Sequence, residues 1–333
     1  MSNSCCEAAP GGTPIAVSAR LVLKDCLGAL KVRLGWGRNN YRVRPGLYAL
    51  GRPDPESPVL ASANYKLTFD TLRKNLSGLD AWLLILDTQG VNVWCAAGKG
   101  TFGTRELIRQ VIKTRLAEKV THRRLFLPQL GAPGVRSPEV LRLTGFTVSF
   151  GPVRAKDIKA FLAARGQATR DMRRVNFTLW DRLILAPVEF TRAARPAVFA
   201  FGVMFILNLV AARPFGRPDF ILLTGTILTG TVLTPALLPW VPGPAFSWKG
   251  GVLGLIWALA GLAAVGWFTP DFGLLSVGYI LLLPALSAWL ALNFTGSSTC
   301  TSPSGVLKEM RIALPLILSA AVLGAVLVLA GTL

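Results

Sequence analysis

The sequence predicts an α/β domain with a parallel sheet, followed by an all-α transmembrane domain of about five helices. The first observation behind this is charge: residues 1–195 contain 31 Lys+Arg and 14 Asp+Glu, whereas residues 196–333 contain 5 and 3. Soluble domains are about 25% charged, so the second stretch predicts a set of membrane spans. This excludes a purely soluble enzyme, a disordered regulator and a disulfide-linked secreted protein.

The second observation is the alternation of short apolar runs with helix-like segments in the first part. Strands are predicted at residues 46–50, 58–61, 82–86, 124–127 and 146–150, and helices at 67–76, 103–116, 137–143 and 155–164. The run at 82–86 reads WLLIL, which is typical of a central strand covered on both faces. Such alternation predicts a Rossmann-like parallel sheet with helices on both faces.

Ligands bind to such sheets where loops leave the carboxyl ends of the strands. The loops in question are residues 62–66, 88–103, 128–135 and 151–155.

The domain boundaries follow from the same patterns. We expect a partly disordered tail at residues 1–44, the α/β domain at 45–168, a basic amphipathic linker at 169–195 and the transmembrane domain at 196–333. The polar N-terminus lacks the apolar segment of a signal peptide, so the α/β domain should be cytoplasmic, where thiols stay reduced. The five cysteines include no C-x2-C pair.

Five spans are predicted, at about 197–212, 220–240, 251–269, 273–293 and 312–331. With the basic domain inside the cell, Lys249, Lys308 and Arg311 fall on the cytoplasmic side, whereas Arg213 and Arg217 fall outside. The spans themselves contain no Asp, Glu, Lys or Arg, which argues against a transporter. The protein is thus expected to be a multi-pass protein of the cytoplasmic (inner) membrane.

The linker alternates arginines with apolar residues and could lie among lipid headgroups or pack on the α/β domain. The net charge of +19 suits anionic lipid, and no nucleic-acid motif accompanies it.

The chemistry is expected in the segment that follows the central strand, which reads Asn92-Val-Trp-Cys95-Ala-Ala-Gly98-Lys99-Gly100. Asn92 is a good N-cap for a helix that begins at Val93. Cys95 then lies in the first turn, where backbone N–H groups favour a thiolate, and Lys99 adds positive charge one turn later. A thiolate above a glycine-lined floor suits a soft metal or an electrophile.

Generic alternatives fit this segment poorly. A phosphate-binding P-loop lacks its first glycine and its Ser/Thr, the dinucleotide pattern is broken by Trp94 and Cys95, and His122 is the one histidine available for a Cys–His pair. A lone loop cysteine is more often inert than catalytic.

The motif Asn92–Lys99 nevertheless resembles the signature of the HgcA family, the corrinoid proteins of the mercury-methylating HgcA/HgcB pair. The resemblance extends through residues 63–70, 127–132 and 150–155, which are shared more loosely with the corrinoid domain of the acetyl-CoA-pathway corrinoid iron–sulfur protein. The loop at 293–299 also fits, although Cys300 stands where the family has an aromatic residue.

The resemblance implies a cobalamin-type corrinoid with the Cys95 thiolate as lower axial ligand to cobalt, which makes Cys95 both the metal ligand and the catalytic residue. The histidine-ligand motif D-x-H-x-x-G is absent, and thiolate is a strong, soft donor that favours release of a methyl carbanion to Hg(II). The implied cofactor-binding residues are Ser62, Ala63, Asn64, Asn92, Val93, Trp94, Cys95, Ala96, Ala97, Gly98, Lys99, Gly131, Ala132, Gly151, Pro152 and Val153. For Trp94, simple core packing is the stronger interpretation.

The implied function is a corrinoid-dependent methyltransferase that forms methylmercury. Its partners would be an HgcB-like ferredoxin with two 4Fe-4S clusters, since this chain has no cysteine set for a cluster, and a folate-linked methyl donor or methyltransferase. Cys5 and Cys6 could relay Hg(II), although a tail without a role is the simpler interpretation. The alternatives are a membrane-anchored corrinoid methyl carrier of one-carbon metabolism and a non-catalytic, membrane-tethered α/β binding module.

Overall fold

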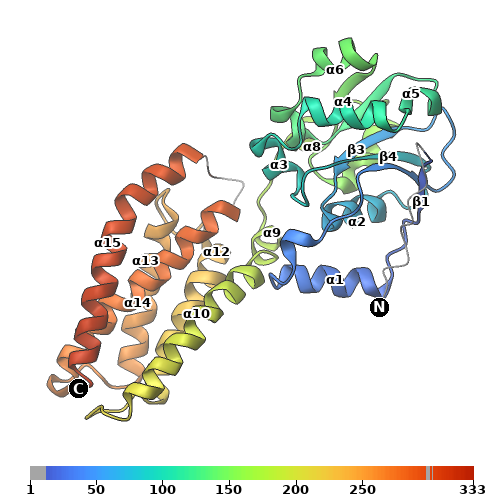
Figure 1. The fold of residues 1–333 in the computed structure, drawn as a ribbon. Coiled ribbons are helices and arrows are strands. Elements are labelled where there is room, and N and C mark those ends of the chain that lie inside the picture. Colours follow the sequence, from blue (N-terminus) through green and yellow to red (C-terminus); the bar gives the residue numbers. More distant parts are fainter. Residues whose placement is uncertain (1–12, 298–300, 302) are drawn as a thin grey trace. The chain divides into compact units, whose positions relative to one another are not determined.

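The computed structural model describes residues 13–297, 301 and 303–333, which form two compact units (Figure 1). The first unit contains the described residues up to Val32 together with Gly37–Val175, and the second contains Arg33–Trp36 and Asn176–Leu333. Cys5, Cys6, Cys300 and part of the 293–299 loop lie outside the described residues.

The first unit is built on a six-stranded sheet with the order β1-β2-β4-β3-β5-β6. The strands are β1 (Ile15–Val17), β2 (Gly46–Leu50), β3 (Val59–Ala63), β4 (Ala81–Leu86), β5 (Arg124–Leu127) and β6 (Thr147–Phe150). Strands β3 to β6 are parallel, as expected, so their carboxyl ends share one edge. The sheet is nevertheless mixed, because β2 runs antiparallel to β4 and carries β1 parallel to itself.

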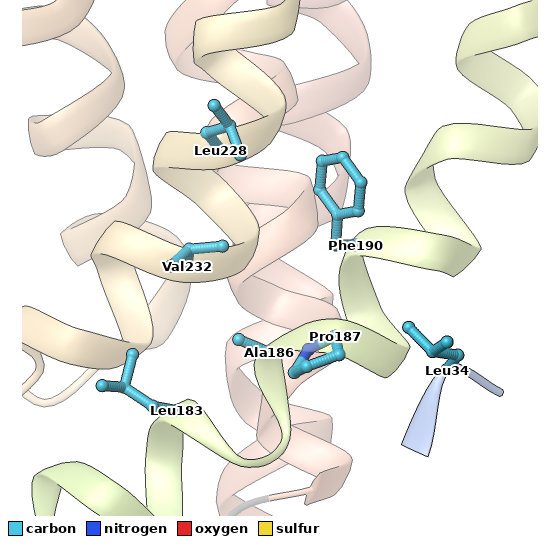
Figure 2. Close-up of a pocket in the computed structure, with 7 residues that line it drawn as sticks. All are labelled: Leu34, Leu183, Ala186, Pro187, Phe190, Leu228 and Val232. Atoms are coloured by element: carbon cyan, nitrogen blue, oxygen red, sulfur yellow. The ribbon is translucent and has the colours of Figure 1, made fainter. Parts of the chain in front are cut away.

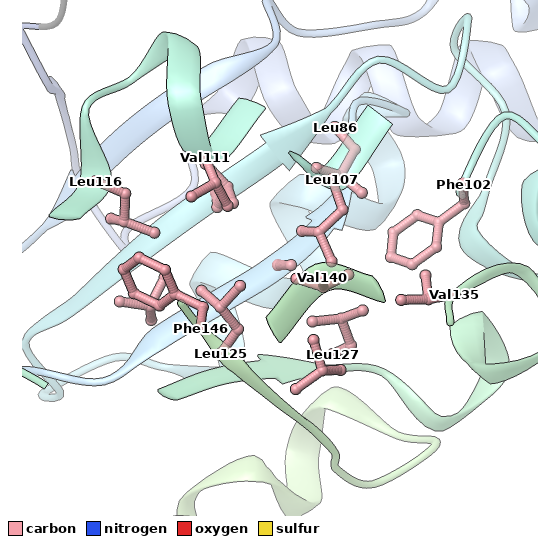
Figure 3. Close-up of a cluster of buried hydrophobic side chains, with 14 of the residues drawn as sticks. Leu86, Phe102, Leu107, Val111, Leu116, Leu125, Leu127, Val135, Val140 and Phe146 are labelled. Atoms are coloured by element: carbon pink, nitrogen blue, oxygen red, sulfur yellow. The ribbon is translucent and has the colours of Figure 1, made fainter. Parts of the chain in front are cut away.

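Helices cover both faces of this sheet. Helices α3 (Val93–Lys99), α4 (Thr104–Lys113) and α6 (Ser137–Thr144) cover one face, and α2 (Lys66–Asn75) and α7 (Ile158–Ala163) the other. The buried strand β4 alternates between the two cores: Leu84 and Leu86 join Leu107 and the first face (Figure 3), whereas Leu83 and Ile85 face α2. The expected α/β fold is confirmed.

Residues 13–44 are more ordered than the expected tail. They contain β1, helix α1 (Leu23–Arg33) and a short 3-10 turn, η1 (Arg38–Asn40). The pattern hides α1 because one of its two buried residues, Asp25, is charged. A three-residue strand such as β1 is likewise too short to produce a periodic signal.

A buried ion-pair network fastens α1 to α2. Asp25 contacts Lys66 at 2.7 Å and Arg73 at 2.6 Å, and Asp70 contacts Lys66 at 2.6 Å and Arg73 at 2.8 Å. Burial alone would raise the pKa of Asp25, but hydrogen bonds from Lys66, the Val22 N–H and Arg73 outweigh it and lower this pKa from 3.8 to about 2.

The second unit is helical. Its elements are α9 (Leu179–Leu183), α10 (Ala186–Leu207), α11 (Arg217–Leu228), the π-helical turn η4 (Thr229–Leu233), α12 (Thr234–Leu237), α13 (Phe246–Ala264), η5 (Pro270–Phe272), α14 (Gly273–Phe294), η6 (Thr295–Ser297) and α15 (Pro303–Ala330). By length and composition, five helical segments of the described chain could cross a membrane, as expected. The first of them begins and ends earlier in the chain than the predicted span 197–212, because α10 runs from Ala186 to Leu207.

Small residues bring α13 and α14 into close contact. A Cβ added at Gly254 would stand 2.6 Å from Cβ of Ser287, and one at Gly250 would stand 2.4 Å from Cβ of Ala291. Close approach through glycine and other small residues is the usual way in which membrane helices associate. The same unit holds an apolar cavity of about 360 Å³ (Figure 2), lined by Leu34, Leu183, Ala186, Pro187, Phe190, Leu228 and Val232.

Charged side chains are buried in the helical unit, among them Asp219 and Arg182. Asp219, in the first turn of α11, is fully buried and accepts a hydrogen bond of 2.6 Å from the Tyr279 hydroxyl. Arg182, expected in a linker that could face headgroups, is 4% exposed and donates to the carbonyl oxygens of Pro235 (3.1 Å) and Ala236 (2.7 Å). The chain from residue 176 is therefore part of the helical unit and not a separate linker.

Candidate functional site

The candidate site lies at the carboxyl edge of the parallel strands, where β4 leads into α3. The side-chain oxygen of Asn92 accepts a hydrogen bond from the Cys95 N–H at 2.9 Å, which confirms Asn92 as the N-cap. Cys95 is in the first turn, unbonded to another cysteine and partly exposed. Gly100 ends the helix with φ 78°, a left-handed conformation that glycine adopts without strain.

Asn64 holds the loop that precedes α3. Its side-chain oxygen accepts hydrogen bonds from the Thr88 N–H (3.1 Å), the Thr88 hydroxyl (2.9 Å) and the Gly90 N–H (2.9 Å). Its amide nitrogen donates to Asp87 at 3.1 Å. Because Asn64 is 1% exposed, its side chain is engaged inside the protein and sets the position of residues 87–90, including Gln89 with φ 57°.

Helix α4 supports the same loop from the other side. Glu106 accepts a hydrogen bond from the Asp87 N–H at 2.8 Å and from Gln110 at 2.8 Å, and pairs with Arg109 at 2.7 Å. The loop before α3 is thus held by one side chain that follows β3 and by another from the helix that follows α3.

The turn η2 (Gln129–Gly134), which follows β5, packs directly on α3. A Cβ at Gly134 would stand 2.1 Å from the Phe102 carbonyl oxygen and 3.3 Å from Cα of Ala97, and one at Gly131 would stand 2.5 Å from the Phe102 ring. These glycines therefore serve packing within the protein, which brings the turn against the cysteine helix.

Gly98 is different. It lies one turn after Cys95 on the same side of α3, and apart from its chain neighbours and the backbone of α3 itself no described atom lies within 4 Å of the place where its Cβ would stand. A glycine inside a helix destabilises it by about 1 kcal/mol relative to alanine. Gly98 is exposed, so packing within the protein does not require this glycine, and the surface of α3 one turn after Cys95 stays open.

The other residues expected at the site lie around this edge. Ser62 and Ala63 end β3 and are 5% and 0% exposed, so they lie beneath the surface of this edge. Gly151 and Pro152 are buried after β6, where the Gly151 N–H donates to the Leu127 carbonyl at 2.8 Å, and Val153 and Ala132 are partly exposed. In α3, Val93, Ala96 and Ala97 are buried, Trp94 is partly exposed and Lys99 is exposed. The structure thus brings all four expected loops to one edge.

Gln129 is a residue whose importance the sequence did not indicate. It begins η2 beside α3, and its buried side-chain oxygen finds no hydrogen-bond partner among the described residues. A buried, unpaired amide oxygen is costly, so this oxygen is available to a donor from a bound molecule or a water. In the segment 127–132, the polar side chain of Gln129 is the one feature of the sequence that could have indicated a role.

Comparison with known proteins connects this site to corrinoid proteins. Residues 36–162 match the family described as CO dehydrogenase/acetyl-CoA synthase delta subunit. The chain is 35% identical over 129 residues to the acetyl-CoA decarbonylase/synthase complex subunit gamma of Archaeoglobus fulgidus, and 36% identical over 132 residues to that of Methanopyrus kandleri. It is 31% identical over 140 residues to the corrinoid/iron-sulfur protein large subunit of Moorella thermoacetica.

These matches cover 38% or 39% of this chain and 27%, 28% and 31% of the three relatives. The likeness therefore concerns the α/β unit, and the chain spans less than a third of the length of these relatives.

Proposed function

We propose that the α/β unit binds a corrinoid at the carboxyl edge of its sheet and serves in methyl transfer, with the Cys95 thiolate as axial ligand to cobalt. The observation that carries this is the pairing of a capped, partly exposed Cys95 with open space at Gly98. The similarity to a corrinoid/iron-sulfur protein large subunit supports the same assignment.

The residues present fit such a group. The unpaired oxygen of Gln129 matches the amide N–H donors at the periphery of a corrin, and the absence of a side chain at Gly98 leaves room for a flat ring beside the thiol. A bound corrinoid would supply the cobalt that carries the methyl group. The protein's own part is to hold the thiolate in place through Asn92 and the loop anchored by Asn64.

The expected cofactor residues would then have different roles, according to their burial and position. The partly exposed Ala132 and Val153 would line the edge of the corrin, the buried Ser62, Ala63, Gly131, Gly151 and Pro152 would support that edge from beneath, and Val93, Ala96 and Ala97 fix α3 to the core. Lys99 is exposed one turn after Cys95 and would place positive charge near the thiolate. Asn64 acts as a positioning residue.

The comparisons favour a methyl carrier related to acetyl-CoA-pathway proteins as the general role. Methylation of Hg(II) is the second candidate, and the observation that favours it is Cys95 itself. If a corrinoid is bound through the Cys95 thiolate, electron donation from this soft ligand would favour transfer of the methyl group to a soft electrophile such as Hg(II). Either role requires a separate reductant, for which an HgcB-like ferredoxin is our proposal, and a folate-linked methyl donor.

We further propose that the helical unit anchors the protein in the cytoplasmic membrane with the α/β unit inside the cell. In this topology Arg213 lies on the exterior side, 3.7 Å from Asp219, whose negative charge offsets it, and 4.3 Å from the Trp267 ring centroid. Its backbone N–H donates to Thr332 at 2.9 Å, which places the loop after α10 beside the C-terminal end, as an odd number of spans requires.

The test compares the absorption spectra of corrinoid-loaded full-length protein, Cys95→Ala and the matched control Cys26→Ala, whose thiol is exposed on α1. Loss of the coordinated spectrum in Cys95→Ala alone supports the proposal, and identical spectra in all three contradict it. Incubation of the methylated, loaded protein with Hg(II), followed by measurement of methylmercury, then separates the two candidate acceptors.

A further inference from the structure

Helix α1 has two opposite faces that differ in their surroundings. Asp25 and Val32 are buried, and Asp25 is held by Lys66 and Arg73 of α2. Figure 1 shows α1 beside α2. On the other face, Leu23, Leu27 and Leu30 are 75%, 57% and 56% exposed. The ion-pair network thus fixes which side of the helix points outward.

The exposed leucines form one stripe, because residues at spacing i, i+4 and i+7 fall on the same side of a helix. Basic residues border this stripe: Lys24 and Lys31 are exposed on one side, and Arg33 is partly exposed on the other. An apolar stripe between basic flanks is the pattern of helices that lie at the surface of an anionic bilayer.

The chain beyond α1 belongs to the helical unit. Leu34 lines the apolar cavity with Pro187 and Phe190 (Figure 2). The uncharged stretch 196–212 begins at Pro196, nine residues after Pro187. Nine residues span about 13 Å along a helix. Trp36, which follows, is 53% exposed, and tryptophan is enriched at membrane interfaces.

We propose that α1 is a membrane-surface helix, which inserts Leu23, Leu27 and Leu30 among the headgroups of an anionic bilayer. The inference rests on the proposed membrane anchoring but not on the corrinoid site. The lysines indicate that the partner is anionic lipid, since each basic residue near an anionic surface raises the binding constant about fivefold. Because the spans keep the bilayer within reach, weak insertion of a short helix suffices.

The test uses the full-length chain in phospholipid nanodiscs, with a fluorophore on Cys26, next to the leucine stripe. The other four cysteines are replaced by serine. A matched chain with Cys26→Ser carries the label at Leu143→Cys on α6, where the leucine is 50% exposed. Nitroxide-bearing lipids quench the fluorophore only if it reaches the headgroup layer.

We expect strong quenching at Cys26 and weak quenching at position 143 in discs that contain phosphatidylglycerol. Lys24→Glu with Lys31→Glu should lower the ratio of inserted to free helix by at least about twentyfivefold, from about fivefold for each lysine. Leu23→Ser, Leu27→Ser and Leu30→Ser together should abolish quenching, whereas the control pair Leu141→Ser and Leu143→Ser should leave it unchanged.

Equal quenching at the two label positions would overturn the proposal, as would quenching that is indifferent to the lysines and leucines. Protection of the Cys26 label from aqueous iodide without lipid quenching would show that a protein surface covers the stripe, which also overturns it. Flotation of the same chain with vesicles tests the anchoring separately, so that a chain that floats but shows no quenching contradicts the α1 inference alone.

Discussion

The side-chain oxygen of Asn92 lies 2.9 Å from the backbone nitrogen of Cys95, so the residue that starts α3 also holds the peptide group of its cysteine. The helix is only seven residues long, from Val93 to Lys99, and cannot rely on its own length for stability. The orientation of the Cys95 thiol therefore depends on this cap and on the loop that Asn64 secures.

Replacement of Asn92 by alanine should loosen α3 and weaken the bond between thiolate and cobalt. Loss of an N-cap costs about 1 kcal/mol, and the buried core would otherwise remain intact. We expect a shift of the corrinoid absorption bands toward those of Cys95→Ala, with little change in overall thermal stability.

Asn92→Ser is the matched control, because serine also caps helices well. It should retain the wild-type spectrum. If Asn92→Ala and Asn92→Ser gave the same wild-type bands, the cap would be irrelevant to the position of the thiol.

Gly98→Ala should separate stability from binding. Alanine stabilises a helix interior by about 1 kcal/mol relative to glycine, and no described atom obstructs its Cβ. The variant should therefore unfold at a slightly higher temperature without a corrinoid, yet bind the corrinoid more weakly because the methyl group fills the space beside Cys95. Equilibrium titration with a corrinoid, alongside calorimetry, measures both effects.

Gly78→Ala is a useful comparison, since Gly78 lies between α2 and β4, away from this edge, and has φ 79°. It should lower stability through backbone strain and leave corrinoid affinity unchanged. Unaltered affinity in Gly98→Ala would mean that the space beside Cys95 is not part of the binding site.

The parallel core of the fold could be predicted from sequence because its strands are continuous apolar runs. The run WLLIL became the buried strand β4, with side chains that alternate between two cores. The direction of β2 leaves no such signature, since an apolar strand looks the same in a parallel and an antiparallel pairing. Helix α1 was missed because its buried face carries Asp25, whose partners Lys66 and Arg73 lie more than 40 residues away.

The candidate site likewise combines features that the sequence predicts with features that it does not. The cap at Asn92 and the place of Cys95 in the first turn are local properties, and local pattern predicts them. The engagement of Asn64 with Thr88 and Gly90, and the unpaired oxygen of Gln129, depend on how separate loops meet at the sheet edge. Sequence spacing does not contain that information.

Arg182 should be important for the helical unit, in contrast to other arginines nearby. It is 4% exposed and its guanidinium donates to Pro235 and Ala236 at the end of α12, where carbonyl groups lack partners within the helix. Arg182→Ala should destabilise this unit by about 2 kcal/mol and expose the chain around α9 to proteolysis.

Arg192→Ala serves as its control, because the Arg192 side chain is 62% exposed and pairs only with Glu189 at 3.3 Å. Trypsin digestion and thermal unfolding in detergent would compare the two. Equal protection of the two variants would show that the contacts of Arg182 contribute little.

The buried network around Asp25 should make the α/β unit sensitive to acid. The pKa of Asp25 is lowered from 3.8 to about 2, so the stability that its ionised form contributes is fully present above about pH 4 and is lost as the pH falls toward 2. A shift of this size corresponds to at most about 2 kcal/mol, because solvent screens part of the interaction. Asp25→Asn should therefore be less stable than wild type at pH 7, and this difference should shrink between pH 4 and pH 2.

Urea unfolding of the full-length protein, followed by pulsed hydrogen exchange of peptides from β1 to β6, would measure the stability of this unit alone at each pH. Asp54→Asn is the matched control: the Asp54 carboxylate accepts hydrogen bonds from its neighbours Ser57 and Glu56, so its loss leaves α1 and α2 joined. Because Asn retains the shape of Asp without its charge, a difference between wild type and Asp25→Asn that stays constant down to pH 2 would assign the effect to packing instead of ionisation.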